Sequence, residues 1–267
     1  MADADRCASL VSEGDPDLYR AAMFAPEPLR TDLMVLIAFD IELSKAAARA
    51  SEPVIAAMRL QWWRDVVAEM GAETDPRAHE VVGPLTHLLV RRGLSKPDLT
   101  ALIDAREAEL QTPLTAECFA QWQAMRVTPL LRLGAQAVGV AEHTSLQAMG
   151  PAMALAFALR NAVAMARQGL YLLPLAGLDR SALARGETTE TARRTIAGLA
   201  DRALTDLKQS RANSVPKRLK PVLRLGWRAD AVLEMALAPD FEFTDARSAL
   251  ARGGTMRLLG WSLTGRW

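Results

Sequence analysis

The chain has 267 residues, of which 50% are hydrophobic and 24% charged, and its formal net charge is +1. This length permits one large domain or two small ones, and the near-neutral balance gives no sign of a nucleic-acid partner. Cys7 and Cys118 lie far apart in the sequence, which favours a reducing compartment over a disulfide framework. Residues 1–13 are acidic and poor in apolar side chains, so we expect a cytoplasmic protein without a secretory signal. Peripheral attachment at the inner face of a membrane is the alternative.

Proline, glycine and capping residues divide the chain into helical blocks, and no segment alternates like a strand. Asp15 is a candidate N-cap with Pro16 at the first helical position. We expect a disturbance at Pro129 and a break at Gly150-Pro151. The predicted helices cover residues 15–23, 29–50, 53–70, 98–111, 114–138, 143–169, 189–210 and 216–237.

These blocks predict a single all-α domain. We expect a flexible segment over residues 1–14, a helical domain over residues 15–237 and a tail over residues 238–267. The common catalytic signatures are absent, because the sequence has no nucleotide-binding glycine loop and no HExxH motif. We expect the histidines to be structural or exposed: His79, His87 and His143.

Several segments carry a resemblance through their order and spacing. Leu36-Ile-Ala-Phe39 is followed by Arg59-Leu-Gln-Trp62, and later by residues 155–161 and 169–174. In this order they resemble the squalene/phytoene synthase family over residues 15–237. The resemblance implies an isoprenoid synthase-type helical bundle around a deep cavity. The side chains that it places at the cavity are Phe39, Trp62, Phe157, Arg160 and Tyr171.

The resemblance also implies two aspartate-rich motifs that hold magnesium, which binds the diphosphate of a prenyl substrate. Carboxylates four residues apart share one helix face, and magnesium prefers such oxygen ligands. In this sequence the first motif falls on Ser44, Lys45 and Ala48, and the second on Asn161 and Met165. With the carboxylates missing from both motifs, we expect no metal site and no cofactor.

Other carboxylates are weak candidates for a relocated magnesium site. Asp40 and Glu42 are two residues apart, so on a helix they point in different directions. Two pairs at i,i+4 spacing, Asp65 with Glu69 and Asp230 with Glu234, are interpreted as solvated helix faces. A magnesium-dependent prenyl transferase that uses Asp40, Asp65 or Glu69 is therefore an alternative with little support.

A longer pattern is similar to one divergent branch of this family. It consists of Ala38-Phe39, Glu42-Leu43, Ser51-Glu52 and Met58-Arg-Leu-Gln-Trp62. That branch includes a mitochondrial assembly factor for respiratory complex I and also lacks the aspartates. The resemblance implies a non-catalytic assembly role with protein partners, respiratory complex subunits among them. A carrier that holds a prenyl lipid in the cavity is a further alternative. Alanines at 46–48, 154, 156 and 158 would line the cavity or pack helices, and we favour packing.

Two segments are candidates for a partner or membrane surface. Residues 208–228 interleave basic and apolar side chains, with Lys217, Arg218 and Lys220 at the centre. The end of the chain carries Trp261 and Trp267 among leucines. For the basic segment, the alternative is a core-facing helix with a solvated basic side. For the end of the chain, it is packing on its own domain. In each case we favour this alternative over an external surface.

Overall fold

The computed structural model describes residues 2–48, 53–72, 75–174, 179–245 and 255–267. Over these ranges the regular elements are helices, and no strand occurs among them. The all-α prediction is confirmed. The helices are α1 (Ala2–Gly14), α2 (Pro16–Met23), α3 (Leu29–Ala48), α4 (Pro53–Glu69), α5 (Val82–Arg92), α6 (Lys96–Glu109), α7 (Ala116–Arg126), α8 (Thr128–Ala137), α9 (Thr144–Ala166), α10 (Arg180–Arg185), α11 (Glu190–Ala212), α12 (Lys220–Leu223), α13 (Ala229–Met235) and α15 (Thr255–Thr264).

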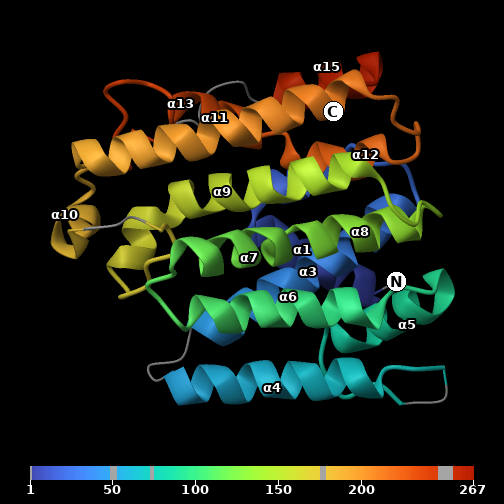
Figure 1. Cartoon of the computed structure of the whole chain (residues 1–267). Coiled ribbons are helices and arrows are strands. Elements are labelled where there is room, and N and C mark those ends of the chain that lie inside the picture. Colours follow the sequence, from blue (N-terminus) through green and yellow to red (C-terminus); the bar gives the residue numbers. More distant parts are fainter. Residues whose placement is uncertain (1, 49–52, 73–74, 175–178, 246–254) are drawn as a thin grey trace.

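The long helices lie roughly alongside one another, from α4 at one edge of the bundle to α11 and α15 at the other (Figure 1). The central helix α9 packs against α7, α8, α11 and α13, while α3 packs against α1, α4, α6 and α8. Among the described helices, α9 is long and apolar enough to cross a membrane by length and composition alone, with 50% of its apolar window buried. Its neighbours on several sides account for that composition, because a helix that is apolar all round is buried.

Several predicted helix starts are confirmed. The carboxylate of Asp15 accepts hydrogen bonds from the backbone N–H groups of Asp17 and Leu18, which caps α2 as expected. The hydroxyl of Thr189 caps α11 in the same way. The helix expected from Asp98 begins two residues earlier, because the hydroxyl of Ser95 is the cap.

The flexible segment expected over residues 1–14 is instead the helix α1. Cys7 and Val11 are fully buried in the core, and α1 packs against α3. These two side chains are four residues apart, so they form an apolar stripe on one helix face. The acidic residues on either side of this short stripe, Asp3, Asp5 and Glu13, hide it in the sequence.

The breaks within the later helices also differ from the prediction. The helix expected over residues 114–138 is divided at Val127 into α7 and α8, and Pro129 lies in the first turn of α8, where proline is tolerated. No break occurs at Gly150-Pro151, since α9 continues through Pro151. The extensive packing of α9 outweighs the cost of an internal proline.

The prediction of a single helix over residues 216–237 is wrong. This segment forms α12, a 3-10 turn over Arg224–Gly226, and α13. A side chain at Gly226 would place its Cβ 2.1 Å from the Sδ atom of Met149 on α9, so glycine permits a close approach of the two segments. Two short helices that we did not predict, α5 and α10, complete the bundle.

The expectation that the tail packs on its own domain is supported by α15. Leu258 and Trp267 are buried, and Lys220 Nζ donates a hydrogen bond to the carbonyl oxygen of Gly265 at 2.7 Å. Arg257 and Arg211 both bond the carboxylate of Asp230. Asp230 is therefore buried, whereas the sequence predicted a solvated position.

The basic segment over residues 208–228 also agrees with the favoured alternative, in which its apolar side chains face the core. Leu219, Val222, Leu223, Leu225 and Trp227 are buried, while three basic side chains are exposed, Lys208, Lys217 and Arg218.

The close contact between α8 and α9 gives a testable prediction. A Cβ at Gly150 would lie 2.8 Å from the Cα atom of Thr128, so Gly150→Ala must push the two helices apart. We expect a loss of about 1–3 kcal/mol in the free energy of unfolding, measured by chemical denaturation. Gly198→Ala in α11 is the matched control. That glycine is exposed with no neighbour within 4 Å, and we expect a gain of about 0.5–1 kcal/mol. Equal effects of the two substitutions would contradict this account.

Candidate functional site

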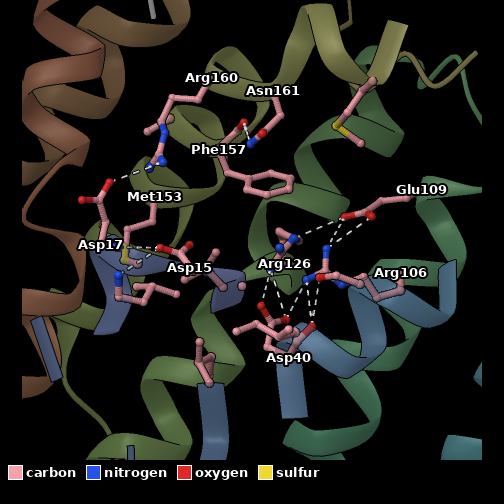
Figure 2. Close-up of a pocket in the computed structure, with 18 of the residues that line it drawn as sticks. Asp15, Asp17, Asp40, Arg106, Glu109, Arg126, Met153, Phe157, Arg160 and Asn161 are labelled. Carbon is pink, nitrogen blue, oxygen red and sulfur yellow. Dashed lines mark hydrogen bonds and ion pairs between the residues drawn. The ribbon is translucent and has the colours of Figure 1, made fainter. Parts of the chain in front are cut away.

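A cavity of about 450 Å³ lies inside the bundle (Figure 2). Its walls come from α2, α3, α6, α7, α8, α9 and the segment 225–229. This volume lies within the range of small-molecule sites in proteins. Much of the wall is apolar: Leu18, Ile41, Ala47, Leu130, Met153, Ala156, Phe157, Ala164, Met165, Leu170 and Trp227.

Four positions of the degenerate motifs face this cavity, Ser44 and Lys45 from α3 and Asn161 and Met165 from α9. The Ser44 hydroxyl donates to the carbonyl oxygen of Asp40, and the Asn161 amide donates to that of Phe157. The Lys45 ammonium lies 2.6 Å from a carboxylate oxygen of Glu42. The fifth position, Ala48, belongs to α3, and its side chain lies outside the described residues.

This donor set does not fit the magnesium cluster that the fold family implies. A magnesium cluster needs paired carboxylates at these positions. The cavity instead has the ammonium of Lys45, the hydroxyl of Ser44, the amide of Asn161 and the thioether of Met165. Across the described ranges, no group of three or more His, Cys, Asp or Glu side chains could hold a metal ion. We therefore derive no chemistry through a metal at this site.

A buried network of four charged side chains closes one end of the cavity. Asp40 from α3 lies 2.8 Å from Arg106 on α6 and 3.3 Å from Arg126 on α7. Glu109 on α6 lies 3.0 Å from Arg106 and 3.2 Å from Arg126, and it accepts a hydrogen bond from the indole of Trp122. Figure 2 shows Asp40 and Glu109 on either side of the two guanidinium groups. The network balances two negative charges against two positive ones.

The surroundings of these groups shift their pKa values. Burial alone would raise the pKa of Asp40, but the charges of Arg106 and Arg126 and their hydrogen bonds hold it below its ordinary value of 3.8. Burial and the neighbouring charge of Arg106 lower the pKa of Arg126. The guanidinium of Arg126 also lies over the ring of Phe157, 4.4 Å from its centroid. Asp40 thus remains ionised and bound to arginine, which leaves it unsuited to a metal.

A second charged cluster surrounds Asp17 at the opposite side of the cavity (Figure 2). Its carboxylate lies 3.2 Å from Arg20 and 3.5 Å from both Arg160 and Arg228. The indole of Trp227 donates to the backbone oxygen of Asp17, and the Arg228 guanidinium lies 3.9 Å from the Trp227 ring centroid. Three cations therefore share one carboxylate. The nearby Asp15 also faces the cavity, and burial raises its pKa.

Only part of the predicted cavity set lines the cavity. Phe157 and Arg160 do so, whereas Phe39 is fully buried with its ring 5.3 Å from that of Trp63. Trp62 packs on Trp63, 4.9 Å between ring centroids, and Tyr171 lies under the guanidinium of Arg180. These three side chains stabilise neighbouring elements and do not contact the space inside.

The remaining metal candidates, Asp65 and Glu69, lie outside the cavity. Asp65 and Glu69 project from exposed positions of α4, where they bond Gln61 and Arg77 respectively.

Five charged cavity residues were not predicted from the sequence, because each of them alone resembles an ordinary surface position. The one available signal was Arg106, which follows the apolar run Leu102, Ile103 and Ala105 in α6. The missed residues are Asp17, Arg106, Glu109, Arg126 and Arg228.

A helical bundle around an apolar cavity, with the two motif helices facing each other across it, defines an isoprenoid synthase-type protein. The family model for squalene/phytoene synthase matches residues 11–252. The chain therefore belongs to the squalene/phytoene synthase family, as the sequence resemblance implied.

Two relatives of this chain are complex I assembly factors. The chain is 27% identical over 259 residues to the Drosophila melanogaster homologue of NADH dehydrogenase (ubiquinone) complex I, assembly factor 6. That alignment covers 90% of this chain and 77% of the fly protein. The human assembly factor 6 is 30% identical over 105 residues, which cover 39% of this chain and 31% of the human protein. The similarity to the assembly-factor branch is thus confirmed.

Two solved structures share the fold. A dehydrosqualene synthase bound to a ligand superposes with a TM-score of 0.81 at 12% identity, covering 99% of this chain and 96% of that one. The squalene synthase HpnC from Alicyclobacillus acidocaldarius gives 0.72 at 18% identity, covering 87% and 92%. At these identities the comparison establishes the fold, and the isoprenoid synthase-type bundle predicted from the sequence is confirmed.

The buried network predicts an acid-dependent stability. Because folding lowers the pKa of Asp40, its contribution is fully present above the ordinary pKa of 3.8 and is lost as the pH falls from there toward the folded-state pKa. We expect Asp40→Asn to lose about 3–5 kcal/mol at neutral pH, since Arg106 and Arg126 then share only Glu109. The loss should shrink in chemical denaturation series carried below about pH 4. Asp65→Asn, at an exposed position, should change stability by less than about 0.5 kcal/mol at every pH. A pH-independent loss for Asp40→Asn would refute the linkage.

Proposed function

We propose that this chain is a non-catalytic member of the family that serves the assembly of a membrane respiratory complex of the complex I type. One observation carries the proposal. The cavity of the fold is retained, yet Ser44, Lys45, Asn161 and Met165 occupy the positions that face each other across it. The similarity to complex I assembly factor 6 over 90% of the chain supports the same role.

The chemistry of the cavity argues against prenyl transfer. Ionisation of a prenyl diphosphate releases a highly charged leaving group, which a metal cluster would have to stabilise. Three carboxylates of the wall, Asp17, Asp40 and Glu109, are already bound by arginines. A relocated site would need these ion pairs to break inside a largely apolar space, which leaves buried charges without partners.

An assembly role requires protein partners, and subunits of the respiratory complex are the proposed ones. We propose a cytoplasmic protein that works at the inner face of the membrane. The exposed Lys217 and Arg218 offer a modest basic surface for anionic lipid headgroups. Trp267 does not contribute, since it is buried against the bundle, and Trp261 and Lys220 are engaged in the docking of α15.

Removal of the gene from its host tests the assembly role. We expect less assembled complex I on native gels and a lower rate of NADH oxidation by membranes, both restored by the full chain. The succinate dehydrogenase activity of the same membranes is the control and should not change. Normal complex I together with loss of a prenyl-derived product would contradict the proposal and favour an enzyme.

A direct assay separates the enzymatic alternative. Purified protein incubated with farnesyl or geranylgeranyl diphosphate should release no pyrophosphate, with or without magnesium, because the motif positions Ser44, Lys45, Asn161 and Met165 supply no carboxylate. Magnesium-dependent release that disappears in Asp40→Ala or Asp65→Ala would show that the metal site had moved. An active family member assayed in parallel verifies the conditions.

A further inference from the structure

The helix α15 carries an exposed apolar stripe on the side that faces away from the bundle. Met256 and Leu263 are the most exposed large apolar side chains of the described residues, at 77% and 79%, and Leu259 is 39% exposed. The three stand at i, i+3 and i+7, so they share one helix face. Leu258, on the opposite side of the helix, is buried. The helix is therefore apolar toward the domain and apolar toward the outside.

The inner side of α15 is fixed to the domain by hydrogen bonds near its end. Lys220 Nζ donates to the carbonyl oxygen of Gly265 at 2.7 Å. The guanidinium of Arg224 donates to the carbonyl oxygens of Trp261 and Arg266, at 3.2 and 2.9 Å. The helix thus presents its apolar stripe from a defined position, at the edge of the bundle opposite α4 (Figure 1).

Within the described residues, four exposed basic side chains flank α15. Two of them stand three residues before Arg211 and Lys220, which contact Trp261 and Gly265. None of the four has a carboxylate partner among the described residues. An uncompensated positive surface attracts an anionic one. The four side chains are Lys208, Lys217, Arg218 and Arg266.

This combination fits a lipid surface better than a second protein. The ten residues of α15 extend over about 15 Å, which is too short to cross a hydrocarbon core of about 30 Å. A helix with an apolar outer face and flanking cations instead lies in the plane of the membrane interface. A stable protein interface buries about 800 Å² on each partner, which three side chains of one short helix do not provide.

We propose that the outer face of α15 docks on a bilayer that contains anionic phospholipids. Met256, Leu259 and Leu263 enter the boundary between headgroups and acyl chains, while the inner side of the helix stays on the domain. Lys217 and Arg218 contact the lipid phosphates. This inference rests on the membrane location proposed above, and it assigns the surface responsible for that location.

Co-sedimentation of the full chain with phospholipid vesicles tests the proposal. We expect binding to vesicles of phosphatidylcholine and phosphatidylglycerol in equal amounts, at least about tenfold tighter than to phosphatidylcholine alone. High salt should weaken this binding, because exposed charges are screened. No binding to the anionic vesicles, or equal binding to both kinds, would overturn the proposal. The gene-removal assay reports on the assembly role separately, so the failure of one is distinguishable from the failure of the other.

Substitutions in the stripe test its apolar contribution. Met256→Gln combined with Leu263→Gln should weaken vesicle binding at least about tenfold, since it removes apolar contacts and leaves every charge in place. Glutamine preserves the helix propensity of these positions. Val54→Gln combined with Met58→Gln on α4 is the matched control, because both side chains are 67% exposed at the opposite edge of the bundle (Figure 1). Thermal unfolding of each variant checks that it folds. Equal losses in the two pairs would contradict the assignment.

Substitutions of the flanking cations test the headgroup contact. Lys217→Gln combined with Arg218→Gln should weaken binding about tenfold and make it less sensitive to salt. Arg185→Gln combined with Arg194→Gln removes the same charge from exposed positions of α10 and α11 and should change binding less than about twofold. Equal losses in these two pairs would refute the contact. Lost complex I assembly with intact vesicle binding in Met256→Gln combined with Leu263→Gln would assign the stripe to a protein partner and overturn the proposal.

Discussion

The buried network of Asp40, Arg106, Glu109 and Arg126 is the interaction on which the interior of this protein depends. It joins α3, α6 and α7 at one end of the cavity, and Trp122 adds a fifth polar contact. A buried ion pair contributes little net stability, since desolvation offsets most of the attraction. Its effect is geometric, because charged groups that must keep their partners fix the separation of the helices that carry them.

That geometry helps to explain why the cavity persists without the chemistry for which the fold is built. An apolar space between helices tends to fill as neighbouring side chains relax into it. Here the small side chains of Ala47, Ala156 and Ala164 leave room, and the charged groups at its ends cannot move inward without losing their partners. The predicted role of the alanines in helix packing holds for Ala154 and Ala158, which are buried in the core.

The sequence permitted a good prediction of the fold because its signals are local. Asp15 before Pro16 and Thr189 before an amphipathic stretch mark helix starts, and the structure has caps at both. Failures arose where tertiary contacts outweigh local preference. The helix α9 continues through Pro151 because it is packed on several sides. The segment around Gly226 bends because it closely approaches Met149. Neither contact is visible in a linear pattern.

The candidate site was only partly predictable for the same reason. Ser44, Lys45, Asn161 and Met165 were placed at the cavity by family resemblance, whereas Arg106 and Arg126 come from α6 and α7, which carry no motif. Arg106 and Glu109 are an ordinary i,i+3 pair in sequence, indistinguishable from a surface pair until Asp40 and Arg126 are brought beside them. The aromatic residues Phe39 and Trp62 gave the opposite error. The family resemblance placed them at the cavity, but they pack between helices.

The distribution of charge, more than the loss of any one carboxylate, distinguishes this interior from a metal site. A magnesium cluster requires carboxylates that face one another with their oxygens unengaged. Here each wall carboxylate of the two arginine clusters contacts at least two guanidiniums, so the acids neutralise cations within the protein. Restoring one aspartate to α3 or α9 would add a single ligand beside these arginines, which would compete with the metal for it. Recovery of a magnesium site would therefore require removal of the arginines as well as return of the aspartates.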